Sequence, residues 1–117
     1  MGSAGNRAMS WLLRDGSVLA SAEVADTFAR RARGLIGVRS YEGAMVLPHT
    51  RAVHTFGVRF PLDVAFCDRD MRVVAVVTMR PLRLGRPRRG GRTVIEAAAG
   101  AFGRWGLAVG DQLELRQ

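Results

Sequence analysis

The chain has 117 residues, the length of one domain, and its 48% hydrophobic and 24% charged residues are typical of a folded protein. No apolar run approaches the roughly 18 residues that a membrane helix needs, so we expect no membrane insertion. The first residues lack the sustained apolar segment of a signal peptide, which favours a cytoplasmic location unless a leader has been removed. The single cysteine, Cys67, cannot form an internal disulfide bond.

The formal net charge of +8 is distributed unevenly along the chain. All 18 basic residues are arginines, and six of them lie in Arg80–Arg92, where there is no acidic residue. Prolines and glycines interrupt this segment, so we expect an irregular surface loop. Binding of nucleic acid or an acidic partner through this loop is an alternative function. The loop lacks, however, the interleaved aromatic residues and the helical period of common nucleic-acid-binding surfaces.

The first part of the chain predicts a hairpin followed by a helix. Apolar residues flank Asp15-Gly16, a dipeptide that tolerates the positive φ angles of a tight turn, so residues 8–25 predict two paired strands. Asp26 and Thr27 can each cap a helix, and the apolar residues that follow them fall on one arc of the helical wheel. We therefore expect the chain's one substantial helix over residues 27–36.

The stretch Val53–Asp68 is predicted to form the centre of the core. Apart from His54 itself, the even-numbered residues from His54 to Phe66 are apolar. This alternation has the two-residue period of extended chain. Pro61 lacks the N–H group that a sheet ladder requires. We therefore predict two strands here, the second beginning at Leu62.

Further strands are predicted at Ala44–Leu47, Met71–Thr78, Thr93–Ala98 and Gln112–Arg116, with at most two helical turns between the last two. About eight short strands and one helix predict a single mainly β domain over residues 1–117. We expect a small antiparallel β-sandwich or a partly closed barrel, jelly-roll-like in arrangement, with one short α-helix after the first hairpin and a helical turn near the C-terminus. A parallel α/β sheet is not expected, because most loops are too short for crossover connections.

Short motifs are spread from the predicted helix to the end of the chain. They are Arg30, Arg33-Gly34-Leu35-Ile36, Ala44-Met45, Pro61-Leu62-Asp63, Val94-Ile95-Glu96 with Gly100, and Gly110-Asp111. In order and spacing they resemble the bacterial and archaeal family known as domain of unknown function 192. The resemblance implies a small, mainly β, jelly-roll-like domain and suggests carbohydrate binding. Many members carry M-K-N-T before P-L-D, whereas this chain has HTFGV at His54–Val58, so no role of that lysine or asparagine transfers.

Two carboxylates lie inside apolar strand runs, Asp63 in PLDVAF and Glu96 in TVIEAA. A carboxylate that is half buried in such a run must be paired or hydrogen-bonded. We predict that the two acids line one polar pocket together with His54, Thr55 and Arg59. In that pocket they would accept hydrogen bonds from a small polar or carbohydrate-like ligand, without catalysis.

Two other interpretations of these acids stay open. The structural interpretation is an ion pair with Arg33 or Arg59, because arginine is the usual partner of a buried carboxylate. The other interpretation is a hydrolase in which Asp63 and Glu96 serve as an acid and base pair.

A metal site is not predicted. The candidate ligands are His49, His54, Asp63, Cys67, Asp68 and Asp70. They show none of the recurrent spacings of metal-binding motifs. We therefore predict neither a metal nor another cofactor, and the sequence leaves the oligomeric state open.

Overall fold

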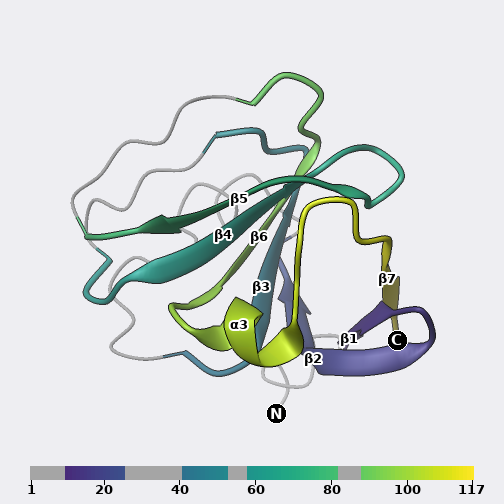
Figure 1. Cartoon of the computed structure of the whole chain (residues 1–117), viewed down its shortest axis with the longest axis horizontal. Coiled ribbons are helices and arrows are strands. Elements are labelled where there is room, and N and C mark those ends of the chain that lie inside the picture. The colour runs from purple at the N-terminus through teal and green to yellow at the C-terminus, as the bar shows by residue number, and fades with distance from the viewer. Residues whose placement is uncertain (1–9, 26–40, 53–57, 82–87) are drawn as a thin grey trace, which may run out of the picture.

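The computed structural model describes residues 10–25, 41–52, 58–81 and 88–117 (Figure 1). They form β1 (Ser10–Arg14), β2 (Ser17–Val24), β3 (Ala44–Pro48), β4 (Leu62–Cys67), β5 (Val73–Met79), β6 (Thr93–Ala98), α3 (Ala101–Trp105) and β7 (Leu113–Arg116). The helix predicted at residues 27–36 lies outside the described residues, whereas the helical turn near the C-terminus is confirmed as α3. Among the helices of the described residues, none has the length and apolar character that crossing a membrane requires.

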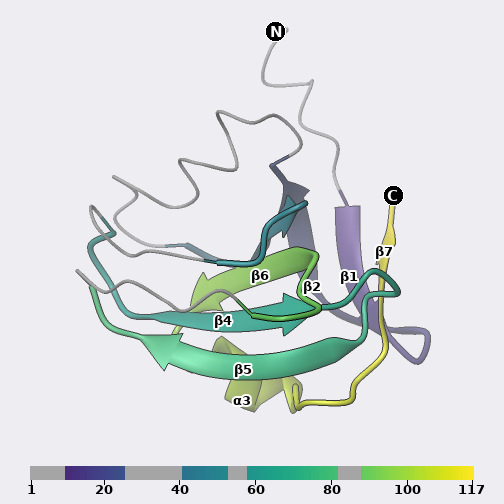
Figure 2. The ribbon, with the colours of Figure 1, turned by 90° about the horizontal axis from the view of Figure 1, so that it is seen from above.

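One sheet contains all seven of these strands in the order β5-β4-β6-β3-β2-β1-β7, and it curls into a half-barrel (Figures 1 and 2). The two edge strands approach each other at one end. The N–H of Val73, at the start of β5, donates to the carbonyl of Asp111 at 2.9 Å, and the N–H of Gly110 donates to the carbonyl of Val73 at 2.8 Å. The mainly β prediction is confirmed, but the sandwich and jelly-roll details are not, because the described strands form one curled sheet.

The neighbouring strands of this sheet are antiparallel except for β2 and β3, which run parallel and pair Ala22 with Ala44. The expectation of an antiparallel sheet is therefore wrong at this one pair. Parallel neighbours need a crossover connection of about a dozen residues or more. The chain between Val24 and Ala44 is long enough to supply it, although most of the other loops are not.

Local sequence signals place several strand ends correctly. Asp15 and Gly16 have φ angles of 52° and 81°, in the left-handed region that a tight two-residue turn requires, so the opening hairpin is confirmed. β4 begins at Leu62, directly after Pro61, as the missing N–H of the proline predicted. All residues of β4 are buried, because other side chains cover both faces of this strand.

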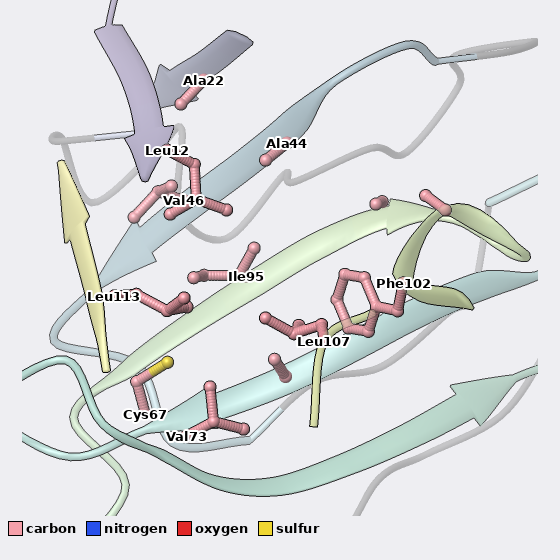
Figure 3. Packing of buried hydrophobic residues seen from close by; sticks show 13 residues of the cluster. Leu12, Ala22, Ala44, Val46, Cys67, Val73, Ile95, Phe102, Leu107 and Leu113 are labelled. Atoms are coloured by element: carbon pink, nitrogen blue, oxygen red, sulfur yellow. The ribbon is translucent and has the colours of Figure 1, made fainter. Parts of the chain in front are cut away.

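A cluster of buried apolar side chains fills the concave side of the half-barrel, which is called the inner face here. Its labelled members in Figure 3 are Leu12, Ala22, Ala44, Val46, Cys67, Val73, Ile95, Phe102, Leu107 and Leu113. All seven described strands contribute to it. Phe102 comes from α3, which follows directly after β6, so this short helix packs onto the inner face.

A second apolar cluster covers the opposite side of β3, β6, β4 and β5, called the outer face. Its buried members are Ala25, Met45, Leu47, Val58, Leu62, Val64, Phe66, Met79 and Val94. Successive residues of a strand point to opposite faces. Since Ile95 and Ala97 of β6 belong to the inner cluster, Val94 and Glu96 point to the outer face.

Candidate functional site

Asp63 lies on the inner face of β4 and is 5% exposed. Its Oδ1 accepts a hydrogen bond from the hydroxyl of Thr78, on β5, at 2.9 Å. Its Oδ2 accepts hydrogen bonds from the N–H of Gly100 at 2.9 Å and from the N–H of Phe102 at 3.0 Å. These two amides stand at the start of α3, where no helix side chain supplies a cap. Asp63 therefore fixes the beginning of α3 against the sheet.

The expectation that Asp63 must be paired or hydrogen-bonded is thus confirmed, with partners other than those predicted. A threonine hydroxyl and two backbone amides take the place of an arginine. Arg59 is exposed and does not bind Asp63, and Arg33 lies outside the described residues.

Glu96 lies on the outer face of β6 and is 4% exposed. It stands directly opposite Met45 of β3 and Val64 of β4, so apolar side chains flank it on both sides. Its Oε1 is buried and has no hydrogen-bond partner among the described residues. Burial raises the pKa of Glu96 from 4.5 to about 7, because the apolar surroundings disfavour the charged form. Near neutral pH this side chain is therefore a mixture of the neutral acid and the carboxylate.

Glu23 and Tyr41 place further polar groups on the outer face. Glu23 of β2 is beside Met45 in the sheet register, two strands away from Glu96. Its Oε1 accepts a hydrogen bond from the hydroxyl of Tyr41 at 3.0 Å. No local sequence pattern indicates these two residues, because only the parallel pairing of β2 with β3 brings Glu23 within two strands of Glu96. The alternating pattern of β2 predicts which face of the sheet Glu23 lies on, but not which residue of the next strand lies beside it.

The two strand carboxylates do not share the single pocket that we predicted. The register of β4 and β6 places Asp63 opposite Ala97, and Val64 opposite Glu96. Opposite residues share a face, so Asp63 points to the inner face and Glu96 to the outer face. Two carboxylates on opposite faces of a sheet cannot flank one bond. The geometry therefore gives no support to a hydrolase built on this pair.

The other predicted site residues are only partly described. His54 and Thr55 lie outside the described residues, and Arg59 is exposed after the buried Val58. Their role in ligand binding stays a prediction.

A hollow of about 330 Å³ opens where β3 ends and β6 begins. It is lined by His49, Thr50, Arg51, Gly90, Gly91 and Arg92. Backbone hydrogen bonds join the two loops: the N–H of Thr50 donates to the carbonyl of Arg92, and the N–H of Arg88 donates to the carbonyl of Arg51, each at 2.9 Å. The N–H of Arg92 also donates to the carbonyl of Cys67, at 2.8 Å. The hollow is therefore a formed feature of the backbone, which we call the basic hollow.

Arg88, in the loop before β6, contacts a residue of the outer cluster. Its guanidinium carbon lies 5.2 Å from the centre of the Phe66 ring, within the range of a cation–π contact. Phe66 is 1% exposed, so this contact is made at the edge of the core. The side chain of Arg88 thereby holds the neighbouring part of the basic hollow in place.

Cys67 is buried at the end of β4. Burial raises the pKa of its thiol to about 12, with a smaller contribution from the nearby charge of Asp68. The thiol is therefore protonated and a poor nucleophile. Within the described ranges, no group of three or more His, Cys, Asp or Glu side chains converges as metal ligands would.

Together these features define a small β half-barrel domain with an unpaired acid on its outer face and a basic hollow at one end. The family model DUF192, described as Uncharacterized ACR, matches residues 11–115. The UPF0127 protein of Pyrococcus abyssi is 36% identical over 98 residues, which cover 79% of this chain and 83% of that protein. The chain belongs to the DUF192 family, which confirms the resemblance seen in the sequence.

Other relatives agree with this assignment. The UPF0127 protein of Thermococcus sibiricus is 33% identical over 98 residues, covering 79% of this chain and 64% of that protein. A crystal structure of a protein of unknown function from Novosphingobium aromaticivorans matches with a TM-score of 0.76 and 24% identity, over 92% of this chain and 84% of that one. At this identity the likeness concerns the fold alone.

Proposed function

We propose that this domain binds a small polar ligand on its outer face and that Glu96 is the residue that contacts it. The observation that carries the proposal is the buried Oε1 of Glu96, which has no hydrogen-bond partner among the described residues. Leaving a buried polar atom unpaired costs about 1–3 kcal/mol. Native structures rarely keep such an atom unless a ligand, an ion or a water molecule completes its hydrogen bonding.

The surroundings of Glu96 favour a ligand that carries hydroxyl groups. With a pKa of about 7, the carboxyl group can both donate a hydrogen bond to a hydroxyl and accept one from it. Met45, which keeps a small exposed fraction, would lie against the apolar part of such a ligand, and Glu23 with Tyr41 would supply a second polar point. An apolar lining with a few polar groups is typical of small-molecule sites. A carbohydrate-like molecule or a polyol has this chemistry.

The proposed role is binding rather than catalysis. Asp63, the partner that a hydrolase would need beside Glu96, faces the other side of the sheet and is held by hydrogen bonds to α3. The thiol of Cys67 is protonated and buried, so it does not serve as a nucleophile.

The test is a screen of sugars, polyols and amino alcohols against the intact chain. Binding is followed by thermal shift and by the NMR signal of the Met45 methyl group, which lies beside Glu96 in the sheet. We expect a ligand to raise the melting temperature and to shift the Met45 signal. Glu96→Gln keeps the shape of the side chain but removes its charge, and it should weaken binding about tenfold.

The matched control is Glu114→Gln, the same change at an exposed position of β7. This variant should bind like the wild type. If no compound moves the Met45 signal at millimolar concentration, or if Glu96→Gln binds as tightly as the wild type, the outer face is not the ligand site.

A further inference from the structure

The basic hollow carries positive charge that no carboxylate of its lining neutralises. Arg51 and Arg92 both line it and are both exposed. Within the part of the chain that the structure describes, neither guanidinium forms an ion pair. His49 contributes an imidazole, and none of the lining residues is acidic. Unpaired cationic groups that converge on a hollow form a site for an anion.

The acid that follows Cys67 in the chain is engaged elsewhere. Asp68 follows Cys67, whose carbonyl holds the loop, but Oδ1 of Asp68 accepts hydrogen bonds from the N–H of Asp70 at 2.9 Å and of Arg72 at 3.0 Å. This carboxylate therefore stabilises the turn between β4 and β5. It is not a counter-ion for Arg51 or Arg92.

The backbone arranges the hollow before any ligand is bound. His49 has a φ of 57°, which is uncommon for a residue with a side chain, and it turns the chain away from β3. The N–H of Gly91 donates to the carbonyl of Arg88 at 2.9 Å, closing a turn on the other side. A Cβ atom at residue 91 would lie 3.1 Å from that carbonyl oxygen and 3.3 Å from Cβ of Arg51. The glycine therefore lets the two loops approach closely.

We infer that the basic hollow binds a small molecule that carries one or two phosphate groups. The planar fork of an arginine side chain matches the oxygen atoms of phosphate, and two arginines here flank one cavity. A volume of about 330 Å³ is at the lower end of the range for ligand sites, which fits a small anion better than a large one. No aromatic residue lines the hollow, so a nucleic acid would find no stacking surface there.

This site is separate from the one proposed at Glu96. The hollow lies before the first residue of β6, whereas Glu96 lies within that strand and stands beside Met45 and Val64 on the outer face. The two sites also differ in charge. A variant of one site should therefore leave binding at the other unchanged, which keeps the two proposals independently testable.

The experiment is a calorimetric titration of the intact chain with inorganic pyrophosphate at about 50 mM salt, where electrostatic contacts are strong. We expect saturable binding to one site. Arg51→Ala and Arg92→Ala should each weaken it about tenfold or more, because each removes charge-assisted hydrogen bonds. Gly91→Ala keeps the charge but crowds Arg51, so it should also weaken binding.

Arg104→Ala is the matched control, because Arg104 is exposed on α3, which follows the far end of β6. It should bind pyrophosphate like the wild type, and so should Glu96→Gln. The amide signals of Gly90 and Gly91 should shift in the wild-type protein, which tests the site without any substitution. The proposal is wrong if pyrophosphate does not bind, if Arg104→Ala weakens binding as much as Arg51→Ala, or if single-stranded DNA or RNA binds where pyrophosphate does not.

Discussion

Arg14 in the first strand and Asp111 in the turn before the last strand form a salt bridge of 2.9 Å. The same guanidinium donates to the carbonyl of Trp105 at 2.9 Å and to that of Gly106 at 2.8 Å. The last carbonyls of a helix lack partners within the helix, so Arg14 satisfies the end of α3. The pKa of Asp111 is lowered, mainly because the N–H of Ala108 donates to its carboxylate and also because Arg14 lies beside it.

Arg14→Ala should destabilise the fold by about 2 kcal/mol, because it removes hydrogen bonds from a charged group that is partly buried. Urea unfolding of the variant and the wild type measures the difference. Arg116→Ala is the matched control: Arg116 pairs with Glu114 at 3.0 Å, but both side chains are more than half exposed. Such surface pairs contribute about 1 kcal/mol or less. Equal losses in the two variants would contradict the role given to Arg14.

Asp63→Ala should destabilise the fold by about 3–5 kcal/mol. The substitution leaves the N–H of Gly100, the N–H of Phe102 and the hydroxyl of Thr78 without their acceptor, and each such loss costs about 1–3 kcal/mol. Thr78→Val removes one of these donors and should cost about 1 kcal/mol. A loss of less than about 1 kcal/mol in Asp63→Ala, measured by urea unfolding, would mean that Asp63 does not hold α3 in solution.

Local patterns in the sequence predict the strands better than their partners. Pro61 marks the start of β4, and Asp15-Gly16 marks the first turn, because both effects act within a few residues. The parallel pairing of β2 with β3 has no local signal. Alternation tells which residues of a strand share a face, but not which strand lies beside it.

The candidate sites show the same limit. Alternation gives the faces of Asp63 and Glu96 within their own strands, and both assignments agree with the structure. The prediction was wrong in assuming that these two faces line one pocket. Whether they do depends on the strand register, and the observed register pairs Val64 with Glu96. The basic hollow was missed for a related reason. Its lining comes from two loops about 40 positions apart, and only pairing of β3 with β6 brings such loops together.

The ionisation of Glu96 should make the fold less stable as the pH rises. The pKa of Glu96 is about 7 in the folded protein and 4.5 when the group is unperturbed. At pH values between these two, the folded state therefore keeps a proton on Glu96 that the unfolded state has lost. The free energy of unfolding should therefore fall from about pH 4.5 to about pH 7, by about 3 kcal/mol from this group. Its contribution should level off about one pH unit above the folded-state pKa.

Glu96→Gln should remove this dependence and should be more stable than the wild type above pH 7. The measurement is urea unfolding at a series of pH values from 4 to 8. Glu114→Gln controls for the general effect of losing one negative charge, since Glu114 is exposed. If the wild type and Glu96→Gln show the same pH profile, Glu96 has partners that keep it ionised.

Gly43 allows β2 and β3 to approach each other where their parallel pairing begins. Its φ is 86°, and a Cβ atom there would lie 2.6 Å from Oγ and 2.7 Å from the carbonyl oxygen of Ser21. Gly43→Ala should therefore combine the strain of a positive φ with a steric overlap, and it should destabilise the fold by about 2–4 kcal/mol.

Gly110→Ala is the matched control, because Gly110 has a φ of 96° but a Cβ atom added there would meet no atom within 4 Å. It should cost about 1–2 kcal/mol, from the positive φ alone. Adding Ser21→Ala to Gly43→Ala removes one of the two overlaps and should restore part of the loss. Equal destabilisation by the two glycine substitutions in urea unfolding would show that β2 does not pack this closely against the start of β3.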